Sequence, residues 1–119
     1  MKYMLLIYNN EQEWDGLTKS QRQGIYGEFR QFRDQITKTG QYVSGSQLQP
    51  VSSATTVKVR QGKQLLTDGP FAETREQLGG YFLIQAKDLD EAVEIAGRIP
   101  AVRFGTVEVR PLVEMTVPV

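Results

Sequence analysis

Two segments of the chain, Lys2–Tyr8 and Tyr81–Ala86, have the pattern of β-strands that are apolar on both faces. In the first segment, one face carries Tyr3, Leu5 and Ile7, and the other carries Met4, Leu6 and Tyr8. Because alternate side chains of a strand point to opposite faces, such a strand belongs in the centre of a sheet covered on both sides. Any fold of this chain must therefore cover both faces of its central sheet.

A long helix is predicted to follow the first strand. Thr18 and Gln21 match a capping box, and Gly40 is placed to end the helix. Gly24 and Gly27 each disfavour the helix by roughly 1 kcal/mol relative to Ala, and we expect close approach to a neighbouring backbone to offset this. One stripe is apolar and is expected to face the core: Ile25, Phe29, Phe32 and Ile36.

A shorter helix is predicted after the second central strand. Asp88 and Glu91 match a second capping box, and Pro100 prevents the helix from continuing. The side chains expected to face inward are Leu89, Ala92, Val93, Ala96 and Ile99.

Further strands are predicted from alternating and β-branched patterns. Gln41–Leu48 is one strand, in which Gly45 marks an expected bulge. Ala54–Arg60 and Lys63–Thr67 flank a Gln-Gly turn and predict a hairpin. Thr106–Val113 alternates again and predicts the last strand.

The segment Glu11–Leu17 is predicted to be a polar loop around Trp14. The indole of Trp14 either packs down on the domain or lines the mouth of a cavity. Packing is the favoured interpretation.

The order of these elements predicts an α+β fold of the ferredoxin-like split βαβ type, with both helices on one face of an antiparallel sheet. The other face would then be apolar and bare, which is unusual for a soluble monomer. We therefore expect a two-fold homodimer that packs sheet against sheet. A cleft is expected between sheet and partner, or between the sheet and the loop that begins at Asp68.

Length and composition restrict the class of protein. The 119 residues fit one domain spanning 1–119, and 14 basic residues balance 14 acidic ones, so neither nucleic acid nor a membrane is an expected partner. The apolar run at the start is shorter than a signal sequence or membrane span. The lack of Cys suits the cytoplasm, and the lack of His removes His-based relays. No cofactor and no metal site is expected.

The string DGPFAETRE from Asp68 to Glu76, followed by LGGY ending at Tyr81, resembles the DGPF signature of the YCII-related proteins. The resemblance implies a dimeric α+β barrel of ferredoxin-like protomers. Some members of that family are linked to degradation of chlorinated aromatics, and others occur near or fused to extracytoplasmic-function sigma factors. Part of the family is proposed to use a His-Asp pair, of which only Asp68 has a counterpart in this sequence. Arg75 stands where the signature usually has Lys, which keeps the charge but changes its hydrogen-bond geometry.

The site residues expected from this stretch each have a structural and a functional interpretation. Asp68 is favoured as a turn residue, and alternatively serves as the general acid or base of a cleft. Arg75 is favoured as part of a solvated face, and alternatively clamps a substrate carboxylate. Tyr8 and Tyr81 are favoured as core residues whose hydroxyls are satisfied, and alternatively form the walls of a substrate-binding site together with Phe71.

Two functions remain open. One is an enzyme that binds or transforms a small aromatic or organic acid in a cleft at the junction of sheet, dimer partner and Asp68 loop. The alternative is a non-catalytic binding or regulatory module that acts through its dimer surface, with a possible link to sigma-factor regulation.

Overall fold

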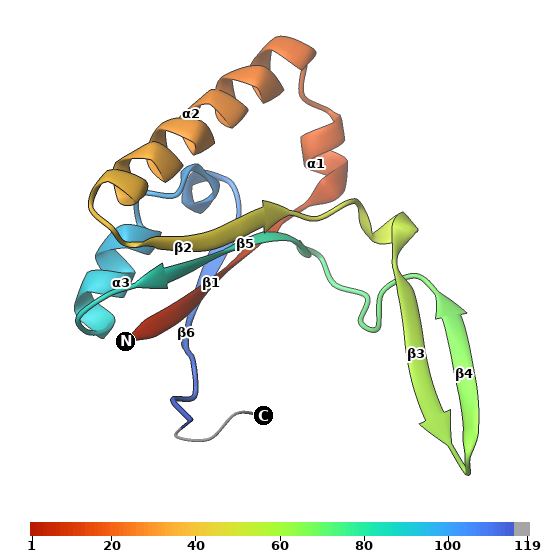
Figure 1. Ribbon diagram of the computed structural model, residues 1–119. Helices are drawn as coiled ribbons and strands as arrows, with labels where there is room; N and C mark the ends of the chain where they lie inside the picture. Colours follow the sequence, from red (N-terminus) through yellow and green to blue (C-terminus); the bar gives the residue numbers. More distant parts are fainter. Residues whose placement is uncertain (116–119) are drawn as a thin grey trace.

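The computed structural model of the protein describes residues 1–115. It is a mixed α+β structure (Figure 1), which confirms the predicted α+β class. The elements are β1 (Lys2–Asn9), α1 (Glu11–Asp15), α2 (Lys19–Lys38), β2 (Tyr42–Gln47), β3 (Thr55–Arg60), β4 (Lys63–Asp68), β5 (Gln77–Gln85), α3 (Leu89–Ala96) and β6 (Thr106–Pro111). Single turns of 3₁₀ helix lie at Val51–Ser53 (η1) and Pro100–Arg103 (η2).

Four strands form one sheet in the order β2-β5-β1-β6, with every neighbouring pair antiparallel. The two strands predicted to be central, β1 and β5, lie in the middle, where Leu5 pairs with Phe82 on one side and Val109 on the other. Helices α2 and α3 lie on the same side of this sheet (Figure 1).

The core lies between the sheet and these helices. Leu5 and Ile84 from the sheet, Ile36 from α2 and Ile95 from α3 have no exposed surface. Burial of an aliphatic side chain of this size stabilises a fold by about 1.5–3 kcal/mol. Phe32, on the predicted apolar stripe, packs edge-on against Phe82 with ring centroids 5.1 Å apart. These contacts anchor the C-terminal half of α2 to the sheet.

The opposite face of the sheet has no helix over it among residues 1–115 (Figure 1). Its side chains alternate with the core residues of β1 and β5 and are half-buried: Met4, Leu6, Tyr8, Tyr81 and Leu83. We call these five residues the open face. Within the described chain, no helix is both long and apolar enough to cross a membrane.

Strands β3 and β4 form a separate two-stranded sheet, as the predicted hairpin requires, but they pair with no other strand. Gln61 and Gly62 form its turn with φ of 51° and 74°, as expected for a two-residue hairpin loop. In Figure 1 the hairpin projects to the side of the four-stranded sheet that lacks helices. Its side chains Val57, Val59 and Leu66 are 55%, 59% and 65% exposed.

The predicted loop at Glu11–Leu17 is wrong in its first part, because Glu11–Asp15 forms α1. Asn10 caps this helix by accepting a hydrogen bond from the N–H of Glu13 at 3.0 Å, and Gly16 ends it. In the sequence, Asn9-Asn10 has the pattern of a turn that ends the first strand. An Asn that begins a turn also serves as an N-cap, and a helix this short has no apolar period to reveal it.

The predicted inward face of α3 is partly wrong. Leu89 and Val93 are 53% and 52% exposed, whereas Ile95 is fully buried. The buried stripe is instead Ala92, Ile95, Ala96 and Ile99. Both stripes obey helical spacing, and the contact of α3 with the sheet selects the second one.

Other details of the sequence interpretation also change. No backbone atom lies within 4 Å of a Cβ built at Gly24 or Gly27, so the expected backbone approach is wrong. The register shift in β2 falls between Tyr42 and Ser44 rather than at Gly45. The last strand ends at Pro111, and Val113 beyond it is 84% exposed.

Candidate functional site

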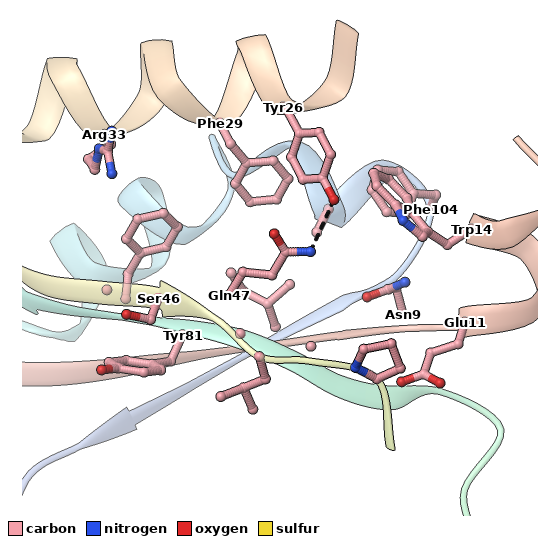
Figure 2. A pocket seen from close by; sticks show the side chains of 18 of the residues that line it. Asn9, Glu11, Trp14, Tyr26, Phe29, Arg33, Ser46, Gln47, Tyr81 and Phe104 are labelled. Carbon is pink, nitrogen blue, oxygen red and sulfur yellow. Dashed lines mark hydrogen bonds between the residues drawn. The ribbon is translucent and has the colours of Figure 1, made fainter. Parts of the chain in front are cut away.

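A cavity of about 490 Å³ lies between α2 and the sheet, open along the edge strand β2 (Figure 2). In Figure 1, α2 rises away from the sheet toward its N-terminus, and α1 stands in the space between them. The capping box predicted at Thr18 is present, with the Gln21 N–H donating to Thr18 Oγ1 at 3.1 Å. The capping box and α1 therefore fix the N-terminal end of α2, which covers the cavity.

Aromatic rings form much of the cavity wall. Trp14 of α1 meets Tyr26 of α2 edge-on at 5.4 Å between ring centroids, and it stacks on Phe104 at 6.2 Å. Phe29 of α2 stacks over Phe82 of β5 at 6.5 Å. Trp14 thus packs on the domain, as favoured from the sequence, and also lines a cavity.

Glycines on the sheet keep the cavity floor low. A Cβ at Gly80 would lie 2.9 Å from the carbonyl oxygen of Ser46, and one at Gly79 would lie 2.9 Å from Oδ1 of Asn9. The pairing of β1 with β5 also shifts register here. Gly79 is the extra residue of a β-bulge, and both glycines allow a close approach to neighbouring atoms that a side chain would prevent.

A hydrogen bond crosses the open edge of the cavity. Nε2 of Gln47 on β2 donates to the hydroxyl oxygen of Tyr26 on α2 at 3.1 Å (Figure 2). The Tyr26 hydroxyl keeps its own proton available to donate. This bond joins α2 to the edge strand of the sheet across the cavity.

Charged side chains line the cavity at both ends. Arg30 and Arg33 come from α2, while Glu11 and Asp15 come from α1. Figure 2 shows Arg33 and Ser46 at one end and Glu11 at the other. The Glu11 carboxylate accepts a hydrogen bond from the N–H of Val51 at 3.0 Å, which ties α1 to η1.

The loop predicted as the centre of the site lies outside this cavity. Asp68 ends β4 and is exposed, and Gly69 after it has φ of 103°. Phe71 is 78% exposed, with Nζ of Lys58 5.0 Å from its ring centroid. Arg75 is exposed, and its carbonyl oxygen accepts a hydrogen bond from Nδ2 of Asn10 at 3.2 Å.

The two predicted tyrosines lie on the open face. Tyr8 donates from its hydroxyl to Oε1 of Glu108 at 3.5 Å. Tyr81 belongs to the cavity lining, but it alternates with Phe82, whose ring faces α2, so its own ring points to the other side of the sheet. Of the five predicted residues only Tyr81 is among those that line this cavity, so the structure does not bring the five together within a single protomer, and their roles stay predictions.

Two arginines near these residues are paired. Arg110 donates from Nε to Oε2 of Glu108 at 2.9 Å, and this hydrogen bond, followed by the charge of Glu108, raises the pKa of Arg110 above its ordinary value. Arg110 is therefore charged throughout the usual pH range. Arg103 pairs with Glu28.

The cavity residues of α2 are not predicted from the sequence, although their spacing shows that they share one side of the helix. Tyr26, Phe29, Arg30 and Arg33 follow each other at helical spacing, so they share one side of α2. The apolar stripe predicts that Phe29 faces the core, and none of the other three is predicted as a cavity residue. Within residues 1–115, no group of three or more acidic side chains is arranged to hold a metal ion.

The fold and cavity define a small α+β protein with an aromatic-lined pocket beside its sheet. The YCII-related domain matches residues 1–116 of the chain. An uncharacterized protein of Rhizobium meliloti (strain 1021) is similar at 32% identity over 114 residues, covering 94% of this chain and 92% of the relative. The chain belongs to the YCII-related domain family, as the DGPF string indicated.

Proposed function

We propose that this protein binds a small organic molecule in the cavity beneath α2 and acts as a homodimer. The observation that carries the binding function is the cavity itself, with a volume of about 490 Å³ and walls that include Trp14, Tyr26 and Phe29. Ligand sites are typically concave, about 300–1,000 Å³ in volume, and mostly apolar with a few polar groups. The Gln47–Tyr26 hydrogen bond supplies such a polar group beside the edge strand of the sheet.

The proposed dimer follows from the open face. The strand order β2-β5-β1-β6, with both helices on one side, supports a ferredoxin-like plan and leaves Leu6 and Leu83 without a covering layer. Apolar surface left in water costs about 25 cal/mol per Å². A second copy packed sheet against sheet would form the dimeric barrel that the family resemblance implies.

A second site belongs to this dimer. The loop that follows Asp68 starts at the root of the hairpin, on the helix-free side of the sheet (Figure 1), so a partner there would lie close to it. We propose Asp68 as the acid or base of this site and Tyr8, Phe71, Arg75 and Tyr81 as its substrate contacts. Both the enclosure and the burial of Asp68 would come from the partner.

The Asp68→Asn variant tests this role. Loss of a detected turnover, with ligand binding and dimer mass retained, is expected if Asp68 transfers a proton. Equal turnover by both proteins would remove Asp68 from the mechanism.

Binding without turnover is the second candidate function. Glu11 is the half-buried carboxylate of the cavity, and it already accepts a structural hydrogen bond from the N–H of Val51. A carboxylate held in this way serves the fold rather than proton transfer, which favours binding without turnover. A regulatory module that signals through its dimer surface would use the same cavity as a sensor. Ligand binding without any chemical change of the ligand would identify it.

The fluorescence of Trp14 tests the binding function directly, because this is the only tryptophan in the sequence. A compound that enters the cavity is expected to change Trp14 emission in a saturable manner and to raise the melting temperature. At 100 times Kd the stabilisation should be about 2.7 kcal/mol. A chemically broad library in which no compound produces either change would contradict the proposal.

A further inference from the structure

The cavity beneath α2 has a charge order that restricts its ligand. Arg33 lies at one end with Ser46, and Glu11 lies at the other end (Figure 2). Arg30 of α2 and Asp15 of α1 also line the cavity, and Nη2 of Arg30 lies near Gly27, one turn closer to the N-terminus of α2 than Arg30 itself. A ligand that fills the cavity lengthwise therefore meets positive charge at one end and negative charge at the other.

The two arginines of the cavity have no acidic partner in the described part of the chain. Among residues 1–115, neither Arg30 nor Arg33 forms an ion pair. By contrast, Arg22 earlier on the same helix donates to the carbonyl oxygen of Leu17 at 2.7 Å, and Arg103 pairs with Glu28. Guanidinium groups bind carboxylates through two parallel hydrogen bonds, which makes a carboxylate the natural occupant of this end.

Between the charged ends the walls suit a flat ring. Phe29 and Phe82 lie nearly parallel, with 16° between their ring planes, and Trp14 and Tyr26 continue the aromatic wall toward α1. Gly45 and Gly80 belong to the sheet side of the cavity and add no side chains to it. Aromatic rings associate best in such offset or edge contacts.

We propose that the ligand is a planar aromatic compound with one carboxylate, bound with its carboxylate at Arg33 and its ring against Phe29, with Arg30 adding positive charge to the same helix. This inference rests on the proposed binding function and adds the ligand's chemical class. The acidic groups Glu11 and Asp15 disfavour a second anionic group at the far end. A neutral group that donates a hydrogen bond to Glu11 or Asp15 is favoured at that end.

Titration calorimetry of the full chain with 2-naphthoate and the neutral 2-naphthamide tests the class. The carboxylate is expected to bind at least about tenfold more tightly, the scale of a hydrogen bond to a charged group. Arg33→Gln, or its combination with Arg30→Gln, should remove this preference while the amide keeps its affinity. The matched control is Arg60→Gln on the exposed hairpin, which should retain the preference.

Equal affinity for the two probes, a preference that survives in the double variant, or no binding of either probe would overturn the proposed ligand class. If neutral compounds still change Trp14 emission in those cases, the binding function stands and only the class fails. If no compound of any charge changes that emission, the binding function fails with it.

Discussion

Gly105 lies where the chain enters β6 and passes directly against β1. A Cβ at this position would lie 2.2 Å from the carbonyl oxygen of Tyr8, which is a backbone atom and cannot rotate away. The close approach of β6 to β1 at this end therefore requires glycine. This explains a residue to which the sequence pattern assigned no role.

Gly105→Ala is expected to lower the free energy of unfolding by about 1–3 kcal/mol, because β6 must shift away from β1. Urea denaturation measures the change. Gly24→Ala is the matched control: no atom lies within 4 Å of the new methyl group, so this variant should gain about 0.5–1 kcal/mol from helix propensity. An unchanged unfolding midpoint for Gly105→Ala would contradict the close approach.

The cavity shows why single residues were hard to assign. Ile36 is fully buried and Phe29 is partly buried, although both lie on the predicted apolar stripe of α2. Periodicity identifies the shared side of a helix, but it does not tell core from cavity wall. Arg30 and Arg33 lie beside that stripe, and a guanidinium at the edge of a cavity has the same sequence pattern as one in solvent.

Among the secondary-structure elements, those with strong local signals were predicted well. The capping box at Thr18, the Gln61-Gly62 turn and the two central strands are all present in the structure. Each depends on residues close in sequence. The errors fall on short elements, namely α1 with five residues and α3 with eight, where one or two turns leave the facing side undetermined.

The stability of the β3-β4 hairpin depends on what covers its exposed apolar side chains. A two-stranded sheet alone is marginally stable in water, and Val57, Val59 and Leu66 are all more than half exposed. Val57 pairs directly with Leu66, and Val59 is two residues further along the same face. This apolar side of the hairpin needs contact with another surface.

At the scale of the whole molecule the protomer is too extended for its length. Its radius of gyration is 16.5 Å, with principal extents of 48 × 47 × 18 Å. The usual scaling with chain length gives a radius of gyration of about 13–14 Å for a compact chain of this length. The projecting hairpin contributes to this shape, because it pairs with no other strand in the part of the chain that the structure describes.

Leu66→Glu is expected to weaken the proposed dimer, because a charge would be placed on the apolar side of the hairpin. Light scattering should give twice the 13.5 kDa of one chain for the unchanged protein and a lower mass for the variant at micromolar concentration. Val93→Glu on α3, where Val93 is 52% exposed, is the matched control and should leave the mass unchanged. A single 13.5 kDa particle for the unchanged protein would contradict the dimer.

The sequence by itself determined which residues share a strand or helix face, where the long helix and hairpin begin, and that one face of the sheet lacks a helical cover. These properties follow from periods of two and 3.6 residues and from capping and turn chemistry, all of which act over a few residues. Only the tertiary structure decided the lean of α2 over the sheet, the position of α1 beneath it and the separation of the hairpin. Such features depend on the angle and distance at which distant segments meet, and packing sets these, so the cavity between Trp14, Phe29 and Arg33 emerges only in the folded chain.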